Sequence, residues 1–189
     1  VGFHCRDRLG PVRALGDDDE VVLGAEDPLQ PSAHQILVVD DDRLVYERYF
    51  GALTAEQSHI AFSVTKSFFG TIAATLIAEG TLDPAAHVAR YIPELAGSGF
   101  GNATVAQVLD MTTAVDFTEN YVDVSSPTMV AYRRAVGLLP RKSEAEPPKS
   151  IYTFLATIVG NGQHGDAFTY RTPNTDVVGW LIARTTGES

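Results

Sequence analysis

The chain is poor in several residue types, and each scarcity excludes a class of protein. A single cysteine, Cys5, in 189 residues excludes an internal disulfide. No apolar run approaches the roughly 20 residues that a membrane-spanning helix requires. Lys and Arg number 14 against 24 Asp and Glu, which gives a formal net charge of −10. We therefore do not expect a nucleic-acid or anionic-membrane partner.

Motifs for metals and nucleotides are also missing. The five histidines show no ligand spacing, and each is expected to be a surface or core residue. The acidic run at residues 17–20 lacks the loop framework of a calcium site and is expected to be an exposed charge cluster. The glycine-rich stretch at residues 160–166 does not end in the Gly-Lys-Ser/Thr of a phosphate-binding loop. We therefore expect neither a metal ion nor a cofactor.

The apolar residues predict one sizeable core, since 44% of the chain is hydrophobic and 20% is charged. Two apolar runs at residues 35–39 and 43–50 flank three aspartates, which predicts an antiparallel hairpin. Residues 116–148 are rich in Pro, Ser and charge and are expected to form a long loop. Helical patterns occur elsewhere, at residues 63–79, 104–111, 150–159 and 172–187, with a short helical turn near residues 82–91.

These elements divide the chain into four predicted segments. An irregular lead-in covers residues 1–34, and the hairpin with the first helix covers residues 35–80. A mainly helical subdomain with the long loop covers residues 81–168, and the last helix with the residues just before it covers residues 169–189.

Ser63 and Lys66 stand three residues apart at the head of an apolar helix. Three helical residues advance about 4.5 Å and return to nearly the same face, so the Lys66 side chain can reach the Ser63 hydroxyl. A serine becomes a nucleophile when a base takes its proton, and burial favours the neutral lysine that can act as this base. The helix N-terminus adds free N–H groups that suit a developing oxyanion. The pattern indicates acyl transfer.

The same spacing also fits an ordinary helix. Serine is common at helix N-caps, and a lysine one turn later is often simply exposed to solvent. A chain of this length contains about one such match by chance. The sequence around Ser63 and Lys66 is therefore needed to distinguish a catalytic pair from an ordinary helix start.

Three motifs occur in one order between residues 35 and 189. Phe-Ser-Val-Thr-Lys-Ser at residues 62–67 follows the hairpin and opens a helix that ends in Glu-Gly-Thr-Leu-Asp-Pro at residues 79–84. The second and third motifs are TVAQVLDMTT at residues 104–113 and FTYRTPNTDVVGW at residues 168–180. Together they resemble the class C branch of the serine β-lactamase and penicillin-binding protein superfamily. Within that branch, the chain is most similar to 6-aminohexanoate-dimer hydrolases and related carboxylesterases.

The resemblance implies a fold and a set of catalytic residues. The expected fold is of the α/β (α+β) class, β-lactamase/D,D-peptidase-like, with an antiparallel sheet flanked by helices and a mainly helical subdomain. Ser63 matches the nucleophile of the family, Lys66 the lysine that helps to take its proton, and Tyr170 the tyrosine that shuttles protons. Tyr170 by itself could equally be a core aromatic residue. Tyr121, in the long loop, is a weaker candidate for closing over a substrate.

Two departures from the family pattern bear on function. Thr172 stands where the class C pattern has the asparagine of Tyr-x-Asn, and a hydroxyl cannot replace both groups of an amide. This favours the hydrolase and esterase branch over a β-lactamase. The third family motif, Lys-Thr-Gly or His-x-Gly on a strand, has no counterpart after Tyr170. We therefore expect the chain to be the N-terminal portion of a longer enzyme, without the C-terminal strands, and to be marginally stable and weakly active or inactive alone.

The resemblance implies a serine hydrolase that cleaves small amides or esters through an acyl-enzyme, with a small molecule as its partner. A β-lactamase or D,D-peptidase is the alternative within the same class of enzyme. A non-catalytic ligand-binding module that keeps the fold is the alternative from another class, since a fold does not determine a function.

Overall fold

A computed structural model describes residues 35–188 of the chain, except for residues 52, 59, 120–124 and 141–149. The chain divides into two compact units, residues 1–62 and 63–189. The acidic run at residues 17–20 precedes residue 35 and so lies outside the described residues. The expected division at residue 80 differs from this one, because the helix after residue 63 groups with the helices that follow it and not with the hairpin.

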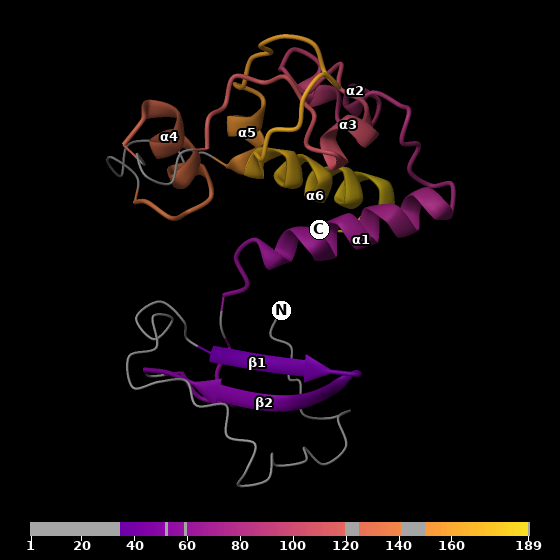
Figure 1. The fold of residues 1–189 in the computed structure, drawn as a ribbon. Helices are drawn as coiled ribbons and strands as arrows, with labels where there is room; N and C mark the ends of the chain where they lie inside the picture. The colour runs from indigo at the N-terminus through magenta and orange to yellow at the C-terminus, as the bar shows by residue number, and fades with distance from the viewer. Residues whose placement is uncertain (1–34, 52, 59, 120–124, 141–149, 189) are drawn as a thin grey trace, which may run out of the picture. The chain divides into compact units, whose positions relative to one another are not determined.

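The described part of the first unit is the predicted hairpin (Figure 1). Strand β1 (Gln35–Asp40) pairs antiparallel with β2 (Arg43–Tyr49), with Gln35 opposite Tyr49 at the open end. Asp41 and Asp42 form the turn with φ of 49° and 60°. Aspartate tolerates this left-handed conformation better than most residues, and two successive positive φ values match the twist of a two-residue hairpin.

The second unit is helical, and α6 (Thr172–Thr186) is its central helix. It contacts α1 (Val64–Ala78) along one side, and Figure 1 shows the two helices side by side. The other helices in the described residues of this unit are short: α2 (Val88–Tyr91), the 3₁₀ helix η2 (Pro93–Leu95), α3 (Val105–Leu109), α4 (Pro127–Ala135) and α5 (Ile151–Leu155). Of these, α2, α3 and α5 also contact α6.

The hydrophobic core surrounds α6. This helix buries Val177 and Leu181 completely, while α1 contributes Ala73 and Leu76 from the facing side. An aromatic group closes the other end of the core, where the Phe117 ring meets Tyr132 and Phe154 edge-on at centroid distances of 5.5 and 6.2 Å. Edge-to-face pairs of this kind add about 0.5–1.5 kcal/mol beyond the area they bury. Packing in this core holds α6 in position, and the position of α6 in turn determines where the residues directly before Thr172 lie.

The structure corrects one prediction about the long loop. Residues 127–135, expected to be irregular, form α4, and its Met129 and Tyr132 side chains are buried in the core. The signals for a helix are present: the Ser126 side chain caps the helix and Pro127 occupies its first position. The proline-rich, charged residues around this short segment concealed its pattern. The predicted helix at residues 150–159 is also shorter, since α5 ends at Leu155.

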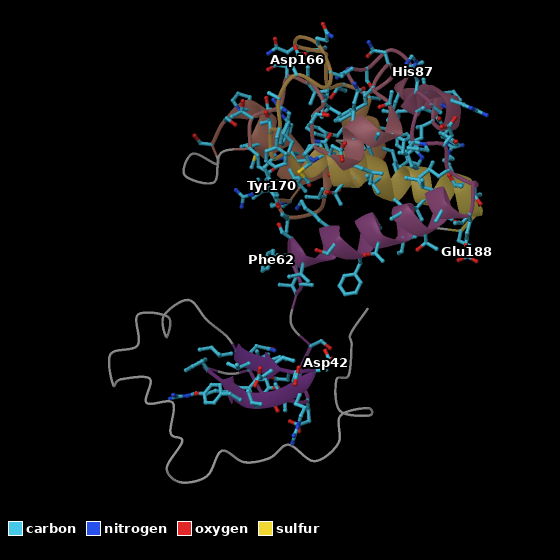
Figure 2. The ribbon with its side chains drawn as sticks, turned by 45° about the vertical axis from the view of Figure 1, so that its right-hand side comes forward. Asp42, Phe62, His87, Asp166, Tyr170 and Glu188 are labelled. Atoms are coloured by element: carbon cyan, nitrogen blue, oxygen red, sulfur yellow. The ribbon has the colours of Figure 1, made fainter. Side chains whose placement is uncertain are left out.

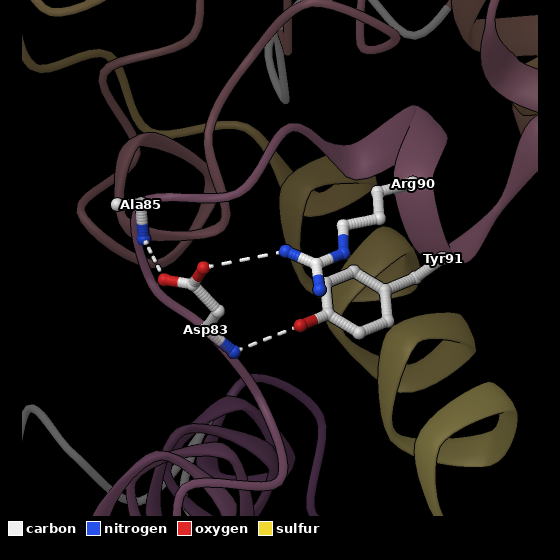
Figure 3. A network of polar contacts seen from close by, with 4 residues as sticks. All are labelled: Asp83, Ala85, Arg90 and Tyr91. Atoms are coloured by element: carbon white, nitrogen blue, oxygen red, sulfur yellow. Dashed lines mark hydrogen bonds and ion pairs between the residues drawn. The ribbon is translucent and has the colours of Figure 1, made fainter.

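A small polar network shapes the connection from α1 to α2 (Figure 3). The Asp83 carboxylate accepts the Ala85 N–H at 2.9 Å and lies 3.5 Å from the Arg90 guanidinium, and the Asp83 N–H donates to the Tyr91 hydroxyl at 2.9 Å. These groups are exposed, so the ion pair adds little stability. The network specifies the shape of the turn. Within the part of the chain that is described, no helix has the length and apolar character that a bilayer span requires.

The stability of the helical unit depends on a close backbone approach at Gly101. A Cβ atom at this position would lie 2.5 Å from the Leu95 carbonyl oxygen and 2.7 Å from that of Ala96. We predict that Gly101→Ala lowers the free energy of unfolding by about 1–3 kcal/mol, because backbone must move to make room. Gly97→Ala is the control, since no atom lies within 4 Å of its Cβ position. Urea unfolding curves would measure both, and equal curves for the two variants would contradict the prediction.

Candidate active site

Ser63 is the N-cap residue of α1, so its hydroxyl stands at the positive end of a 15-residue helix. The side chain is exposed. Phe62, directly before it, adopts a φ of 42°, which is uncommon for a residue with a side chain. Such backbone conformations cost of order 1–3 kcal/mol and are frequent next to functional residues. The chain therefore turns sharply just before the serine.

Lys66 and Tyr170 both lie within hydrogen-bonding distance of the Ser63 hydroxyl. Lys66 Nζ is 3.1 Å from Ser63 Oγ, and the Tyr170 hydroxyl donates to the same oxygen at 2.8 Å. The Lys66 ammonium also lies 5.2 Å from the centroid of the Tyr170 ring. Figure 2 shows Tyr170 at the N-terminal end of α1. Lys66, three residues from Ser63, and Tyr170, 107 residues away, thus meet at the Ser63 oxygen.

The residues on both sides of Tyr170 are fastened to the segment that follows α3. The Thr169 N–H donates to the Met111 carbonyl at 2.9 Å. On the other side, the Arg171 guanidinium donates to the carbonyls of Phe117 at 2.7 Å and Thr113 at 3.0 Å. Partial burial lowers the pKa of Arg171 from its usual value, because desolvation disfavours the charged form. These bonds hold the backbone of Tyr170 at a fixed place beside α1.

Glu119 lies at the N-terminus of α6. Its carboxylate accepts from both the backbone N–H and the hydroxyl of Thr172, the latter at 2.6 Å. Two residues further along, the buried Thr113 hydroxyl donates to the Asn174 side-chain oxygen at 2.7 Å. Arg171 holds the N-cap position of this helix, and Thr172 is its first helical residue. A residue from a distant segment thus provides the cap.

Asp176 is a largely buried carboxyl group close to the site. The pKa of Asp176 is raised to about 6, chiefly by burial and in smaller part by the nearby Glu119 charge, whereas the hydrogen bond from Tyr132 and the Lys66 charge act in the opposite direction. The Tyr132 hydroxyl donates to Asp176 Oδ2 at 3.0 Å. Asp176 therefore changes its charge within the pH range where many enzymes work.

His164 fixes the glycine-rich loop that precedes Tyr170. Its Nδ1 accepts the Ala114 N–H at 2.9 Å, and its Nε2 lies 3.0 Å from the Asn102 side-chain oxygen. The first bond requires an unprotonated Nδ1, so the neutral Nε2–H tautomer fits both. Burial, together with the charge of His87, lowers the pKa of His164 and favours this neutral form. The histidine that was expected to be an ordinary surface or core residue is thus a loop anchor.

The structure brings together three of the four predicted site residues, Ser63, Lys66 and Tyr170. Tyr121 lies outside the described residues. Sequence reasoning missed Glu119, Asp176 and His164, because each acts through a residue that is distant in sequence and no local pattern marks it. Among the described residues, no group of three or more His, Cys, Asp or Glu side chains is arranged to hold a metal ion.

The raised pKa of Asp176 predicts a pH-dependent stability. Its ordinary value is 3.8 and its native value about 6, so its stabilising contribution is complete below about pH 4 and is lost as the pH rises through about 6. We predict that Asp176→Asn, which keeps an acceptor for Tyr132, raises the free energy of unfolding at pH 8 by about 2–3 kcal/mol. Its advantage should disappear near pH 4. Denaturant unfolding across this range would measure it.

Asp116→Asn, at an exposed aspartate, is the control for this experiment. An Asp176→Asn protein that is no more stable than the wild type at pH 8 would contradict the prediction. A stability difference that stays constant from pH 4 to pH 8 would contradict it as well.

The chain was compared with known proteins. The Beta-lactamase family matches residues 30–189. A 6-aminohexanoate-dimer hydrolase of Paenarthrobacter ureafaciens is 39% identical over 151 residues, which cover 80% of this chain and 38% of that protein. The chain thus spans well under half the length of this curated relative.

Two solved structures show the same fold. A Bacillus anthracis protein assigned as a 6-aminohexanoate-dimer hydrolase has a TM-score of 0.79 and 27% identity, covering 97% of this chain and 50% of its own. A D-stereospecific amidohydrolase from Streptomyces has a TM-score of 0.56 and 23% identity, covering 76% and 42%. The predicted β-lactamase-like fold is confirmed, and the chain belongs to the Beta-lactamase family.

Proposed function

We propose that the protein is a serine hydrolase that cleaves small linear amides or esters through an acyl-enzyme on Ser63. The observation that carries this proposal is the convergence of Lys66 Nζ and the Tyr170 hydroxyl on Ser63 Oγ, at 3.1 and 2.8 Å. A nucleophile and its bases must lie within about 2.6–3.2 Å for a proton to pass between them. Both distances meet this condition.

The three side chains have complementary roles in the proposed reaction. In the reacting state Tyr170 has passed its own proton to neutral Lys66, so the Tyr170 oxygen can accept the Ser63 proton while Ser63 Oγ attacks the substrate carbonyl. The N-terminal end of α1 favours the negative charge that develops on the carbonyl oxygen. Tyr170 then gives the proton to the departing amine or alcohol. A water molecule, losing its proton to Tyr170, attacks the acyl group, and Ser63 regains its proton as the acid leaves.

The proposed substrate class follows from the relatives and from Thr172. Two matched proteins carry the name 6-aminohexanoate-dimer hydrolase, and that dimer is a linear amide. Thr172, at the position where class C enzymes have an asparagine, uses its hydroxyl to donate to Glu119 at 2.6 Å. A group that is already engaged in this way is less suited to bind a β-lactam side chain. Both points favour small linear amides or esters over β-lactams.

A ligand-binding module on the same fold would not require this arrangement. A binding pocket needs complementary contacts, whereas a lysine and a tyrosine that both contact one serine oxygen serve proton transfer. The two functions differ in a simple respect: a binding module releases its ligand unchanged, and an enzyme of this type leaves a covalent adduct on Ser63.

The proposal predicts covalent labelling of Ser63. Intact-mass spectrometry after brief exposure to a fluorophosphonate should show one adduct, and peptide mapping should place it on Ser63, because that hydroxyl is the activated one. Ser63→Ala should abolish the adduct. Ser67→Ala, at an exposed serine one turn further along α1, is the matched control and should label like the wild type.

Turnover of three substrates would then test the substrate class. The linear 6-aminohexanoate dimer and a p-nitrophenyl ester should be hydrolysed with higher kcat/KM than the β-lactam nitrocefin. A wild-type protein that folds and hydrolyses none of them, and that does not label on Ser63, would contradict the proposed function. Preferred hydrolysis of nitrocefin would move the assignment to a β-lactamase.

A further inference from the structure

Tyr170 has no regular secondary structure of its own. It lies just before α6, and its side chain is 39% exposed. Packing therefore immobilises its ring only in part. The position of the phenol depends on how the backbone around it is held, and displacing a catalytic group by about 1 Å can reduce the rate about 100-fold.

Glu119 makes the contact that fixes the C-terminal side of this backbone. Arg171, the N-cap residue of α6, has no side-chain capping bond. The carboxylate of Glu119 takes over that role through the Thr172 N–H and hydroxyl, only two residues after Tyr170. The next residue, Pro173, has no N–H to satisfy, and the Asn174 N–H donates to the Arg171 carbonyl at 3.1 Å. Glu119 thus completes the hydrogen bonding of the first turn.

A simple helix cap would not need to be a carboxylate. Ser, Thr or Asn at position 171 could cap α6 locally without a charge. Glu119 instead places a second negative group near Asp176, which raises the pKa of that residue. This repulsion is unfavourable, but the Glu119 carboxylate links the segment that follows α3 to the start of α6. The bonds from Arg171 to Phe117 and Thr113 connect the same two segments. A charge-assisted bond to the helix terminus is stronger than a neutral one.

We infer that Glu119 is a positioning residue that holds the Tyr170 hydroxyl at Ser63 through Thr172. The inference rests on the proposed function, because it assigns a role within the same reaction. Glu119 does not touch the reacting atoms. Its carboxylate fixes the start of α6, and the fixed helix start keeps the preceding tyrosine 2.8 Å from the nucleophile.

Steady-state kinetics on the p-nitrophenyl ester would test this role. Glu119→Ala removes both bonds and should lower kcat about 10- to 100-fold while KM changes less than about 3-fold, because the tyrosine acts on the transition state. Glu119→Gln keeps one side-chain acceptor and should restore most of kcat. Tyr170→Phe sets the lower reference, since it removes the hydroxyl itself.

Thr172→Val tests whether Glu119 acts through Thr172. It removes the hydroxyl and leaves the backbone N–H bond, so kcat should fall less than in Glu119→Ala. The double variant should resemble Glu119→Ala alone, because both changes break the same link. Ser150→Ala is the matched control: it removes the side-chain bond of Ser150 to the Thr153 N–H that caps α5 and should lower the melting temperature without changing kcat.

The outcomes separate the positioning role from the proposed function. If Glu119→Ala loses thermal stability like Ser150→Ala but keeps wild-type kcat, Glu119 is a cap only and the inference is overturned. If Glu119→Ala does not fold, Thr172→Val decides, and wild-type kcat in that variant overturns the inference. A wild-type protein that neither labels on Ser63 nor hydrolyses the ester overturns the proposed function, and the positioning role with it.

Discussion

The packing of α1 against α6 is the constraint on which the candidate site depends. The serine and lysine belong to the first turn of one helix, and the tyrosine immediately precedes the other. Gly179 of α6 faces the Phe69 ring of α1, where a Cβ atom would lie in ordinary van der Waals contact at 3.4 Å. The buried Ala73 and Val177 belong to the same core. The packing of the two helices brings the three side chains at their ends close together, and the segment that follows α3 holds the backbone of Tyr170 in place.

Hydrogen bonds from polar side chains then hold the backbone around the site in the position that helix packing gives it. Arg171 fastens the tyrosine segment to two carbonyls, Glu119 caps α6, and His164 anchors the loop before it. These groups are partly buried, and each carries a desolvation cost that its hydrogen bonds offset. At Asp176, burial raises the pKa more than the Tyr132 hydrogen bond and the Lys66 charge lower it. Proteins often accept such local instability where it serves a reaction, since strain and buried charge concentrate at functional sites.

The sequence carries much of the local structure and part of the site. The hairpin followed from two apolar runs around three aspartates, and the reach of Lys66 to Ser63 followed from helix geometry. Tyr170 could be assigned only by resemblance, because no local sequence pattern around it indicates that its side chain lies beside Ser63. Glu119 and Asp176 could not be found at all, since their partners lie on other elements and depend on how the helices pack. The α4 helix was missed for a different reason: its Ser126–Pro127 start is short and lies within a proline-rich, charged stretch.

A crystal structure of the fluorophosphonate-treated protein would test the central claim most directly. The account predicts continuous density from Ser63 Oγ to phosphorus, with the Tyr170 hydroxyl and Lys66 Nζ still within hydrogen-bonding distance of that oxygen. Phosphorus bound to another residue would contradict the account. So would an adduct on Ser63 from which the Tyr170 hydroxyl has moved out of contact, because the group proposed to pass the proton to the leaving group would then be out of place.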